Sequence, residues 1–372
     1  MLEAVFWAAA GLIVYTHVGY PLLLWLLVRV TRTRTYAAPG DREPPLSVIV
    51  AARNEEAVIA DKVTGALALD YPRDRLELIV SVDGATDATA QRARAAGADV
   101  VLENTRGGKV RAQDAAVARA RGEVVAFSDA NAAWEPGALR ALVAPFLDSR
   151  VGYVCGTVRF TGANGATNQE GLYWRYEMWI RGLESRLASV TAGHGAIYAT
   201  RKDAYLVVDP VMGHDLSFPF NLVKRGWRAV YASAARATEK MVPTVEGEFA
   251  RKRRMMSHTW PIVVRGGMLS PRGYGALYGL MIASHRLLRY ASPFLHLVAL
   301  GANAALLEEG PAYSAAFAAQ LGLVAAAAAP SRARPFLVAR YYVLTTASVA
   351  AGLVDWLRHG TPAGWDAAEG TR

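Results

Sequence analysis

The sequence contains a single cysteine, Cys155, among 372 residues. One cysteine cannot form an intrachain disulfide, and it cannot supply the ligands of a cysteine-based zinc site. Both classes of site are therefore excluded, and Cys155 is most simply a buried apolar residue. Charge is also scarce, since Asp, Glu, Lys and Arg make up 20% of the chain against 53% for hydrophobic residues.

No charged residue occurs between Glu3 and Arg29, and residues 4–28 are largely apolar. A run of this length suffices for a helix that spans a bilayer, which needs about 20 residues. Arg29, Arg32 and Arg34 follow the run, so the positive-inside rule places the residues after Arg29 in the cytoplasm. No basic segment precedes the run, which disfavours a cleaved signal peptide.

Apolar segments return after residue 260 and predict further membrane helices. Residues 274–290 mix apolar residues with one histidine and two arginines, which is typical of a helix lying in the membrane interface. Residues 292–307 and 312–329 are apolar spans separated by a short hairpin. Residues 336–357 form a third hydrophobic segment, which either crosses the membrane or lies along its surface.

The apolar ends enclose a more polar middle, which predicts a multi-pass protein of the inner membrane with a cytoplasmic domain. A linker is expected before this domain, because residues 36–45 contain three prolines, a glycine and mixed charges. The expected units are an N-terminal transmembrane helix at 1–30, a linker at 31–45, the cytoplasmic domain at 46–260, interfacial helices at 261–290, C-terminal transmembrane helices at 291–358 and a tail at 359–372.

Within the middle domain, short apolar runs alternate with segments of helical pattern. The expected strands are residues 46–52, 76–82, 99–102, 124–127 and 151–160, and the expected helices are residues 55–69, 86–96, 109–120 and 135–147. Continuously apolar strands that alternate with helices predict an α/β fold, with a mostly parallel sheet covered on both faces.

Polar residues follow three of these strands, where a parallel sheet presents its ligand-binding edge. They are Arg53, Asn54 and Glu55 after the first strand, Asp83 after the second, and Asp129 and Asn131 after the strand at 124–127. Asp129 and Asn131 offer two oxygen ligands on one side of a tight loop, which fits a divalent cation and the phosphates it carries. An Asx turn leading into the next helix is the alternative interpretation.

Two common phosphate-binding fingerprints are absent from the sequence. There is no GxxxxGK[ST], and no GxGxxG follows the first strand, which disfavours a P-loop NTPase and a dinucleotide-binding Rossmann enzyme. Residues 106–109 (RGGK) either cradle an anion at a helix N-terminus or form a flexible turn. The net charge of +9 accompanies no recognised nucleic-acid-binding module, so no nucleic-acid partner is expected.

An ordered series of motifs resembles that of membrane-bound family 2 glycosyltransferases, which include synthases of cellulose, hyaluronan and poly-N-acetylglucosamine. The similar segments are residues 51–56 (AARNEE, for P-x-x-N-E), 82–89 (VDGATDAT, for D-G-S-T-D-G-T), 107–109 (GGK), 128–131 (SDAN, for D-x-D), 195–201 (GAIYATR), 213–216 (GHDL, for E-D) and 225–231 (RGWRAVY). The resemblance runs from about residue 45 to residue 260.

This resemblance implies a GT-A domain that moves a sugar, with inversion, from a nucleotide-sugar donor, most often UDP-linked. The acceptor would be a lipid-linked or membrane-proximal saccharide, with membrane lipid nearby. Asp129 and Asn131 would sit at the diphosphate with Mg²⁺ or Mn²⁺, and Asp215 would be the general base for the acceptor hydroxyl. The donor-binding residues implied are Arg53, Glu55, Asp83, Lys109, Asp129, Asn131, Arg251 and Arg254, with Glu55 and Asp83 at the base and ribose.

Two departures from the family pattern keep alternatives open. The second Asp of D-x-D is Asn131, which has no formal charge. The Q-x-x-R-W motif of processive synthases would fall at residues 251–255 (RKRRM), where only Arg254 matches. Arg251 and Arg254 either hold phosphate or form a basic face near anionic lipid. The alternatives are a processive polysaccharide synthase that also extrudes its product, and a catalytically silent membrane partner that binds nucleotide.

Several aromatic residues and histidines are further candidates. Four aromatic residues fall on a helix predicted at residues 168–190: Tyr173, Trp174, Tyr176 and Trp179. They either line an acceptor site or serve as packing and interface anchors. His194 and His214 lie in or beside the later motifs, and His214 stands where the family has a glutamate.

Overall fold

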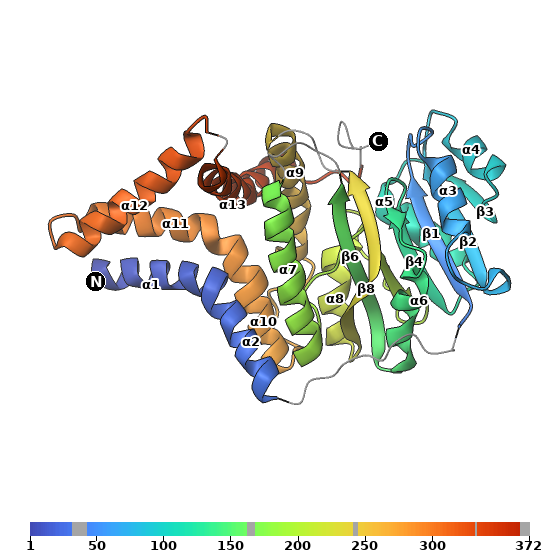
Figure 1. Ribbon diagram of the computed structural model, residues 1–372, viewed down its shortest axis with the longest axis horizontal. Helices are drawn as coiled ribbons and strands as arrows, with labels where there is room; N and C mark the ends of the chain where they lie inside the picture. Colours follow the sequence, from blue (N-terminus) through green and yellow to red (C-terminus); the bar gives the residue numbers. More distant parts are fainter. Residues whose placement is uncertain (32–42, 162–167, 241–244, 332, 365–372) are drawn as a thin grey trace.

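The structure is a computed structural model that describes residues 1–31, 43–161, 168–240, 245–331 and 333–364. It consists of an α/β domain and an arm of long helices that extends from one side of that domain (Figure 1). The sequence positions of the two parts match the expected polar middle and apolar ends.

One mixed sheet forms the centre of the α/β domain. Its strands lie in the order β3-β2-β1-β4-β7-β6-β8-β5. The neighbours β3, β2, β1 and β4 run parallel, whereas β7 runs antiparallel to both β4 and β6. The strands are β1 (Leu46–Ala52), β2 (Leu76–Asp83), β3 (Val100–Asn104), β4 (Val124–Asp129), β5 (Ala133–Trp134), β6 (Val151–Thr161), β7 (Tyr198–Arg201) and β8 (Arg228–Lys240). The predicted α/β fold with a mostly parallel sheet is confirmed.

The sheet is held by apolar side chains on both of its faces. Every residue of β1 and of β2 is buried. Because side chains alternate along a strand, Val48 and Val50 join one core cluster and Ile49 joins the cluster on the opposite face. Full burial of one such side chain contributes about 1.5–3 kcal/mol.

Short helices cover the two faces of the sheet. Residues of α3 (Ile59–Leu67), α4 (Thr89–Ala95) and α6 (Ala138–Val143) pack into the first cluster. Residues of α5 (Lys109–Arg119) and α8 (His214–Lys224) pack into the second. Short 3-10 turns occur at η2 (Arg73–Arg75) and η3 (Ala144–Leu147).

Two helices begin later than the sequence predicts, because side chains and backbone form turns first. α3 begins at Ile59 rather than 55, since Asn54 has a left-handed backbone with φ +52°. α4 begins at Thr89 rather than 86, since the Asp87 carboxylate accepts the backbone N–H of Thr89 at 3.0 Å. These turns leave polar side chains at the edge of the sheet.

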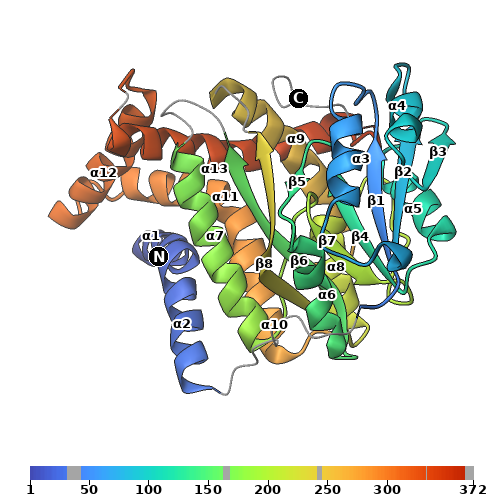
Figure 2. The same cartoon turned by 45° about the vertical axis from the view of Figure 1, so that its right-hand side comes forward.

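Several long helices, together with one short helix and two π turns, form the arm and its junction with the α/β domain. They are α1 (Leu2–Val14), η1 (Tyr15–Gly19), α2 (Tyr20–Val30), α7 (Asn168–Leu187), α9 (Val245–Val264), α10 (Ala276–Met281), η5 (Ile282–Leu287), α11 (Leu288–Ala304), α12 (Pro311–Ala328) and α13 (Arg334–His359). Figure 1 shows α7 and α9 between the sheet and the arm, and Figure 2 shows α13 running from the arm toward the α/β domain.

Two π-helical turns face each other where the helices of the arm change direction. η1 joins α1 to α2, and η5 joins α10 to α11; in Figure 1 each pair bends near its π turn. The hydroxyls of Tyr15 in η1 and Ser284 in η5 share a hydrogen bond of 2.9 Å. Next to it, Glu184 of α7 accepts a hydrogen bond from the Tyr20 hydroxyl at 2.6 Å and contacts His285 Nδ1 at 2.7 Å.

Three helices among the described residues are long and apolar enough to cross a membrane: Leu2–Val30, Pro311–Ala328 and Arg334–His359. They correspond to the segments expected at 4–28, 312–329 and 336–357. The two segments expected at 274–290 and 292–307 differ from the prediction. They form one unbroken helical run, from α10 through η5 to α11, because the π turn absorbs the change in direction without ending the helix.

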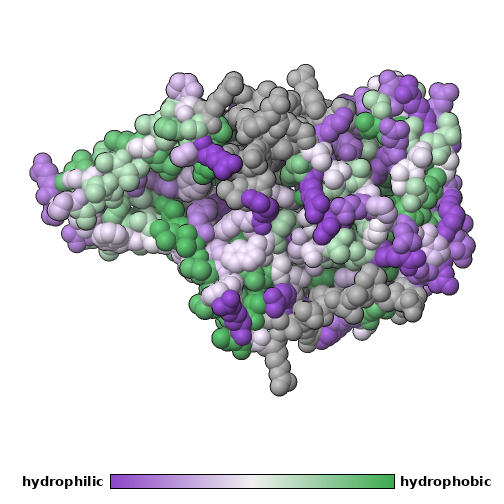
Figure 3. Space-filling model, viewed as in Figure 1, coloured by the Kyte–Doolittle hydropathy of each residue, from purple (hydrophilic) through white to green (hydrophobic). Residues whose placement is uncertain are grey.

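The arm exposes apolar side chains, as a membrane-embedded part would. Trp7, Leu22, Leu297 and Leu321 are each about half exposed or more. On the face shown in Figure 3 the arm is largely green and the α/β domain carries most of the purple, hydrophilic surface. A soluble protein rarely exposes so large an apolar area, which favours burial of the arm in lipid.

The described chain ends against the α/β domain. After α13, Thr361 Oγ1 donates to the Ser257 carbonyl at 2.7 Å. Ala363 then lies so close to Gly108 that a side-chain carbon at position 108 would overlap the Ala363 carbonyl oxygen. The end of α13 is thereby tied to the loop that precedes α5.

Candidate active site

The carboxyl ends of β1, β2 and β4 bring the predicted polar residues to one edge of the sheet. Ala51 in β1 is level with Asp129 in β4, and Ala52 is level with Val82, the residue before Asp83. Asp83 and Asp129 therefore end their strands at the same edge, with β1 between them. This is the edge at which open α/β sheets bind ligands.

The Asp83 carboxylate holds the glycine loop that precedes α5. The backbone N–H of Gly107 donates to Asp83 Oδ1 at 2.7 Å, and that of Gly108 donates to both oxygens at 3.1 and 3.0 Å. Gly108 has φ +92°, a conformation that favours glycine. The amides considered above as an anion cradle are thus committed to Asp83, and the loop presents Lys109 as the first residue of α5.

The residues that follow β1 form hydrogen bonds with the segment between β2 and α4 and with the first residue of α4. The buried Glu55 donates its backbone N–H to Thr89 Oγ1 at 2.8 Å, and Asn54 Oδ1 accepts the N–H of Thr86 at 2.9 Å. Arg53 is half-buried at the same edge. The geometry therefore fixes this loop beside Asp83, where the sequence predicted the base and ribose.

Lys109 and Asp129 form an ion pair at the edge, with their side chains 25% and 23% exposed. Burial disfavours the charged form of both groups, but each charge stabilises the other. The Lys109 ammonium lowers the pKa of the Asp129 carboxyl, and Asp129 raises the pKa of Lys109. Both groups are ionised at neutral pH, so Asp129 offers an anionic oxygen.

Two ionisable residues at this edge were absent from the sequence interpretation. Burial and the Asp129 charge raise the pKa of Glu239, in β8, to about 7. Burial lowers the pKa of Lys62, in α3, to about 7, and its ammonium donates to Ser128 Oγ and the Ala132 carbonyl, both at 2.6 Å. Neither residue lies in a recognisable motif, and a lysine on a short helix is normally exposed.

Asp215 lies in the first turn of α8 and lines a cavity. Its backbone carbonyl accepts the N–H of Gly193 at 2.6 Å, which fixes the start of α8 against the loop before β7. Burial raises the pKa of the Asp215 carboxyl, and the Lys109 charge partly offsets that effect. A raised pKa makes the carboxylate a stronger base, which suits it to accept a proton from a hydroxyl.

The two histidines of this region are neutral. Burial lowers the pKa of His194 and of His214 to about 3 in each case. His194 Nδ1 accepts the N–H of Ala196 at 3.2 Å, and His214 Nδ1 shares a hydrogen bond of 2.9 Å with the Tyr198 hydroxyl. Neither ring therefore supplies a cation, and both act as polar parts of the wall.

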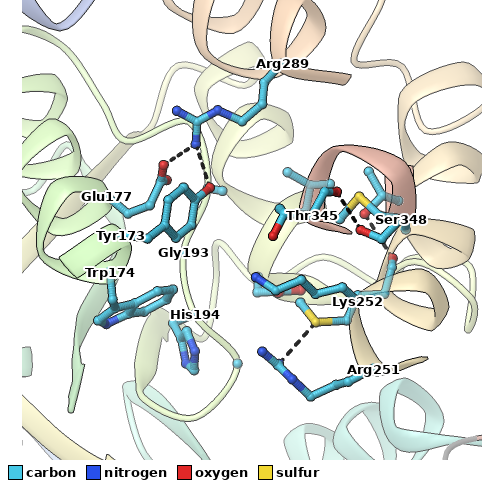
Figure 4. Close-up of a pocket in the computed structure, with 18 of the residues that line it drawn as sticks. Tyr173, Trp174, Glu177, Gly193, His194, Arg251, Lys252, Arg289, Thr345 and Ser348 are labelled. Atoms are coloured by element: carbon cyan, nitrogen blue, oxygen red, sulfur yellow. Dashed lines mark hydrogen bonds and ion pairs between the residues drawn. The ribbon is translucent and has the colours of Figure 1, made fainter. Parts of the chain in front are cut away.

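A cavity of about 820 Å³ joins several of these residues. Of the predicted site, Lys109, Asp129, Asp215 and Arg251 line it, together with Glu239. Figure 4 shows Arg251 and His194 on facing sides of this space. The remaining predicted residues are not among those that line the cavity: Arg53, Glu55, Asp83, Asn131 and Arg254.

Arg251 and Arg254 both lie on α9 but differ in their surroundings. Arg251 lines the cavity and forms an ion pair of 2.7 Å with Glu248, whereas Arg254 is exposed. The arginine that matches the family motif thus does not line the cavity, and the unmatched one does. Donor binding by Arg254 stays a prediction.

Asp129 and Asn131 are the candidate ligands of a divalent cation. Across the residues that the structure describes, no group of three or more His, Cys, Asp or Glu side chains is arranged to hold a metal ion. One carboxylate and one amide oxygen still fit Mg²⁺ or Mn²⁺, because such ions commonly bind one or two carboxylates and take their other ligands from substrate phosphates and water. The residues present therefore fit a cation that is bound together with a diphosphate.

Comparison with known proteins identifies the class. The family model described as glycosyltransferase-like family 2 matches residues 44–257, more than half of the chain. The chain belongs to this family, and its α/β domain is a family 2 glycosyltransferase domain with the GT-A fold. The resemblance drawn from the motifs is confirmed.

Two curated relatives and one solved structure illustrate the match. Beta-monoglucosyldiacylglycerol synthase from Synechocystis sp. is 33% identical over 152 residues, 39% of this chain and 29% of that protein. The probable glycosyltransferase YdaM from Bacillus subtilis is 32% identical over 137 residues, 32% of this chain and 31% of that protein. The matched part thus spans less than a third of either relative's length.

The solved structure is the mannosyltransferase PcManGT from Pyrobaculum calidifontis in complex with GDP-mannose and Mn²⁺. It is 24% identical, with a TM-score of 0.74 over 96% of this chain and 99% of that chain. The likeness therefore extends over the helical arm as well as the α/β domain, and it concerns the fold.

Proposed function

We propose that this protein is an inverting membrane glycosyltransferase. It transfers a sugar from a nucleotide sugar, UDP-linked, to a lipid-linked or membrane-proximal saccharide. The observation that carries the proposal is a single cavity whose wall contains Lys109, Asp129 and Asp215 and also residues of two candidate membrane spans. Such a cavity gives a cytoplasmic donor and a membrane-bound acceptor one meeting place.

The donor is assigned to the sheet edge. Glu55 and Asp83 take the base and ribose, and Lys109 and Arg251 face the diphosphate as cations. A divalent cation bound by Asp129 and Asn131 would neutralise the negative charge that develops on the leaving diphosphate. The ion pair of Lys109 with Asp129 supports this placement, because it leaves an anionic oxygen and a cationic donor side by side.

Asp215 is assigned as the general base. The acceptor hydroxyl oxygen attacks the anomeric carbon while its proton passes to the Asp215 carboxylate. The bond between that carbon and the diphosphate oxygen breaks, and its electron pair leaves with the nucleoside diphosphate. Attack opposite to the leaving group inverts the anomeric centre. General-base catalysis of this kind contributes about 10²–10⁴ to the rate.

The membrane assignment rests on the arm. Among the described residues, three helices are long and apolar enough to cross a membrane, and Arg29 lies in the last turn of the first of them. By the positive-inside rule the catalytic domain is cytoplasmic and the protein is multi-pass in the inner membrane. The name of the Synechocystis relative, a glucosyl-lipid synthase, supports a lipid-borne acceptor here.

The proposal is tested with detergent-purified protein, co-extracted lipid and a panel of nucleotide sugars, with and without Mn²⁺. Release of nucleoside diphosphate with one sugar, matched by sugar in the lipid fraction, is the expected result. Nucleotide binding without consumption of any donor would instead identify a catalytically silent membrane partner. Product length separates the remaining alternative, since single additions indicate the proposed enzyme and long polymer indicates a processive synthase.

The role of Asp215 has its own variant pair. Asp215→Asn is expected to lower kcat by about 10²–10⁴ while donor affinity is kept. Asp203→Asn is the control, because Asp203 is exposed in the turn after β7. Wild-type turnover by a folded, donor-binding Asp215→Asn protein would show that another group is the base.

A further inference from the structure

The cavity continues past the catalytic residues, between helices of the junction and the arm. Its wall includes His17 from the first candidate span and Tyr342 and Thr346 from the last, together with residues of α7, α9 and α11. We call this part the membrane end of the cavity. At about 820 Å³ the whole cavity is larger than one sugar requires.

The membrane end is positively charged. Six cationic residues line the cavity: Lys109, Arg181, Arg251, Lys252, Arg286 and Arg289. Four carboxylates line it, of which Asp129, Asp215 and Glu239 belong to the α/β domain. Glu177 is the single lining carboxylate on the helices described at the membrane end, so cations exceed carboxylates there.

Arg289, in α11, is a largely enclosed cation of the arm. Its side chain is 13% exposed and forms an ion pair with Glu177. Arg289 Nη1 also donates to the Tyr173 hydroxyl at 3.0 Å. Arg289 Nε and Nη2 are buried and have no hydrogen-bond partner among the described residues. Unmet donors on a buried guanidinium are costly, and an anionic oxygen would satisfy them.

Lys252 reaches the same aromatic residue from the other side. The Lys252 ammonium lies 5.5 Å from the centre of the Tyr173 ring and donates to the Tyr341 hydroxyl at 2.6 Å. Figure 4 shows Arg289 and Lys252 entering the space from different helices, with Tyr173 between them. The Lys252 ammonium also forms an ion pair with Glu248 at 3.4 Å, and Arg289 forms one with Glu177. An anion beside Tyr173 would be attracted by both cations.

Apolar side chains continue from this cationic pair into the arm. Tyr176, Val338, Tyr342 and Val349 line the same end, and Val338 to Val349 belong to the candidate span α13. The wall therefore combines a site for a compact anion with an apolar path along membrane helices. A phosphate attached to a lipid chain has this combination of properties.

We propose that the membrane end binds the phosphate group of a lipid-borne acceptor between Arg289 and Lys252, with the lipid chain along α13. The inference rests on the proposed function, because it assigns the acceptor of that reaction to the class of phosphate-linked saccharide lipids. The saccharide hydroxyl then faces Asp215, and the phosphate anchors the acceptor without taking part in bond breaking. A neutral glycerolipid has no anionic group to place beside these cations.

The test measures binding separately from turnover. Farnesyl phosphate, farnesol and inorganic phosphate are titrated into the detergent-purified full-length protein, and binding is followed by tryptophan fluorescence, since Trp174 lines the cavity. Farnesyl phosphate is expected to bind at least about 10-fold more tightly than either partial probe, because only it satisfies the cations and the apolar path together. UDP binding is measured in parallel to report a folded protein.

Variants assign the effect to the two cations. Arg289→Gln and Lys252→Gln are each expected to weaken farnesyl phosphate by about 10-fold while leaving farnesol and UDP unchanged. Arg265→Gln is the matched control, because Arg265 is exposed and contacts Trp356 outside the cavity wall. If Arg289→Gln loses UDP binding and is therefore misfolded, Arg289→Lys and Lys252→Gln decide the question.

Three other outcomes would overturn this inference, and a fourth would overturn the proposed function. Equal affinity for farnesol and farnesyl phosphate identifies a neutral-lipid site, and equal affinity for inorganic phosphate identifies a simple anion site; both overturn this inference. An unchanged phosphate preference in the folded variants overturns it as well. Phosphate-selective lipid binding without any consumption of nucleotide sugar would overturn the proposed function and leave the binding site in place.

Discussion

Lys109, the first residue of α5, forms a buried ion pair with Asp129, the last residue of β4. The pair joins the glycine loop to the strand end, so it couples the two segments that the donor diphosphate is expected to contact. Neither charge is isolated in the folded protein. Removing one of them leaves the other in a largely buried position.

Lys109→Met is expected to lower kcat/KM for the donor by about 10- to 100-fold, the loss typical of a charge-assisted hydrogen bond. The pKa of Asp129, which Lys109 now lowers, is expected to rise. Steady-state kinetics with varied nucleotide sugar measures the effect. Lys202→Met is the control, since the exposed Lys202 donates to the Ala120 carbonyl instead. Equal kcat/KM for the two variants would contradict the role of the pair.

A glycine pair tests how closely the acceptor-side loop is packed. A side-chain carbon at Gly193 would overlap the Tyr153 hydroxyl, whereas one at Gly182 in α7 would lie 3.9 Å from the Tyr231 ring. Gly193→Ala is expected to cost about 1–3 kcal/mol of stability through overpacking. Because the Gly193 N–H holds the Asp215 carbonyl, turnover is expected to fall as well.

Gly182→Ala serves as the control for that variant. It adds a methyl group at ordinary contact distance and replaces a helical glycine, which favours the helix by up to about 1 kcal/mol. Thermal unfolding in detergent and donor turnover are the two measurements. Similar melting temperatures for the two variants would show that the loop before β7 can shift without loss.

Glu239 predicts a pH dependence of stability in the absence of donor and metal. Its folded pKa of about 7 lies above the ordinary value of 4.5. A raised carboxyl pKa contributes stability that is fully present below about 4.5 and is lost as the pH rises through about 7. Glu239→Gln is expected to match the wild type at low pH and to exceed it at pH 8, by on the order of 2 kcal/mol.

The control for this prediction is Glu103→Gln. The Glu103 side chain is 60% exposed in β3, where it pairs with Arg94, and it does not line the cavity. Its unfolding profile is expected to keep the wild-type dependence on pH. A Glu239→Gln profile that runs parallel to the wild type from pH 4 to pH 8 would contradict the assignment.

Arg251 and Arg254 form a natural pair of test positions on α9. Arg251→Gln is expected to raise the donor KM by about 10-fold, because a charge-assisted contact contributes roughly 1.5–3 kcal/mol. Arg254→Gln is expected to stay within a factor of about 2, since Arg254 is exposed. The reverse order would show that the motif position, and not the position in the cavity, determines donor binding.

Asn131 predicts a change in metal affinity. Asn131→Asp adds a formal charge to the candidate ligand set and is expected to lower the Mn²⁺ concentration for half-maximal turnover by about 10-fold. Chelation of divalent cations is expected to abolish turnover in the wild type. Asn221→Asp in α8 is the control, since the Asn221 amide donates to the Ser217 carbonyl outside this set. An unchanged Mn²⁺ requirement would remove Asn131 from the ligands.

The parallel half of the sheet was predictable from the sequence because its strands are short and rich in consecutive apolar residues. Residues 46–52 were predicted as a strand and form β1 with the same bounds. β7 and β8 were not predicted as strands. β7 has four residues, and β8 mixes buried residues with arginines, so neither shows a clear period of two.

The site was predictable to the extent that motifs mark it. Asp83, Asp129 and Asp215 lie in motif segments, whereas Glu239 lines the cavity from the part of β8 beyond the last motif segment. Arg251 lines the cavity because of the way α9 is rotated about its axis. The spacing of residues in the sequence alone does not determine that rotation. The membrane end of the cavity requires contacts between helices far apart in the chain, and no local pattern encodes them.

The segment that follows α13 connects the membrane end of the cavity with the glycine loop. Tyr341 and Val349 of α13 line the membrane end, whereas Ala363 lies against Gly108 beside the donor edge. α13 ends at His359, and the residues after it reach Gly108, so the position of this candidate span and the geometry of the glycine loop are connected. Since a long span adjusts its tilt to the thickness of the bilayer, we expect membrane thickness to influence donor affinity.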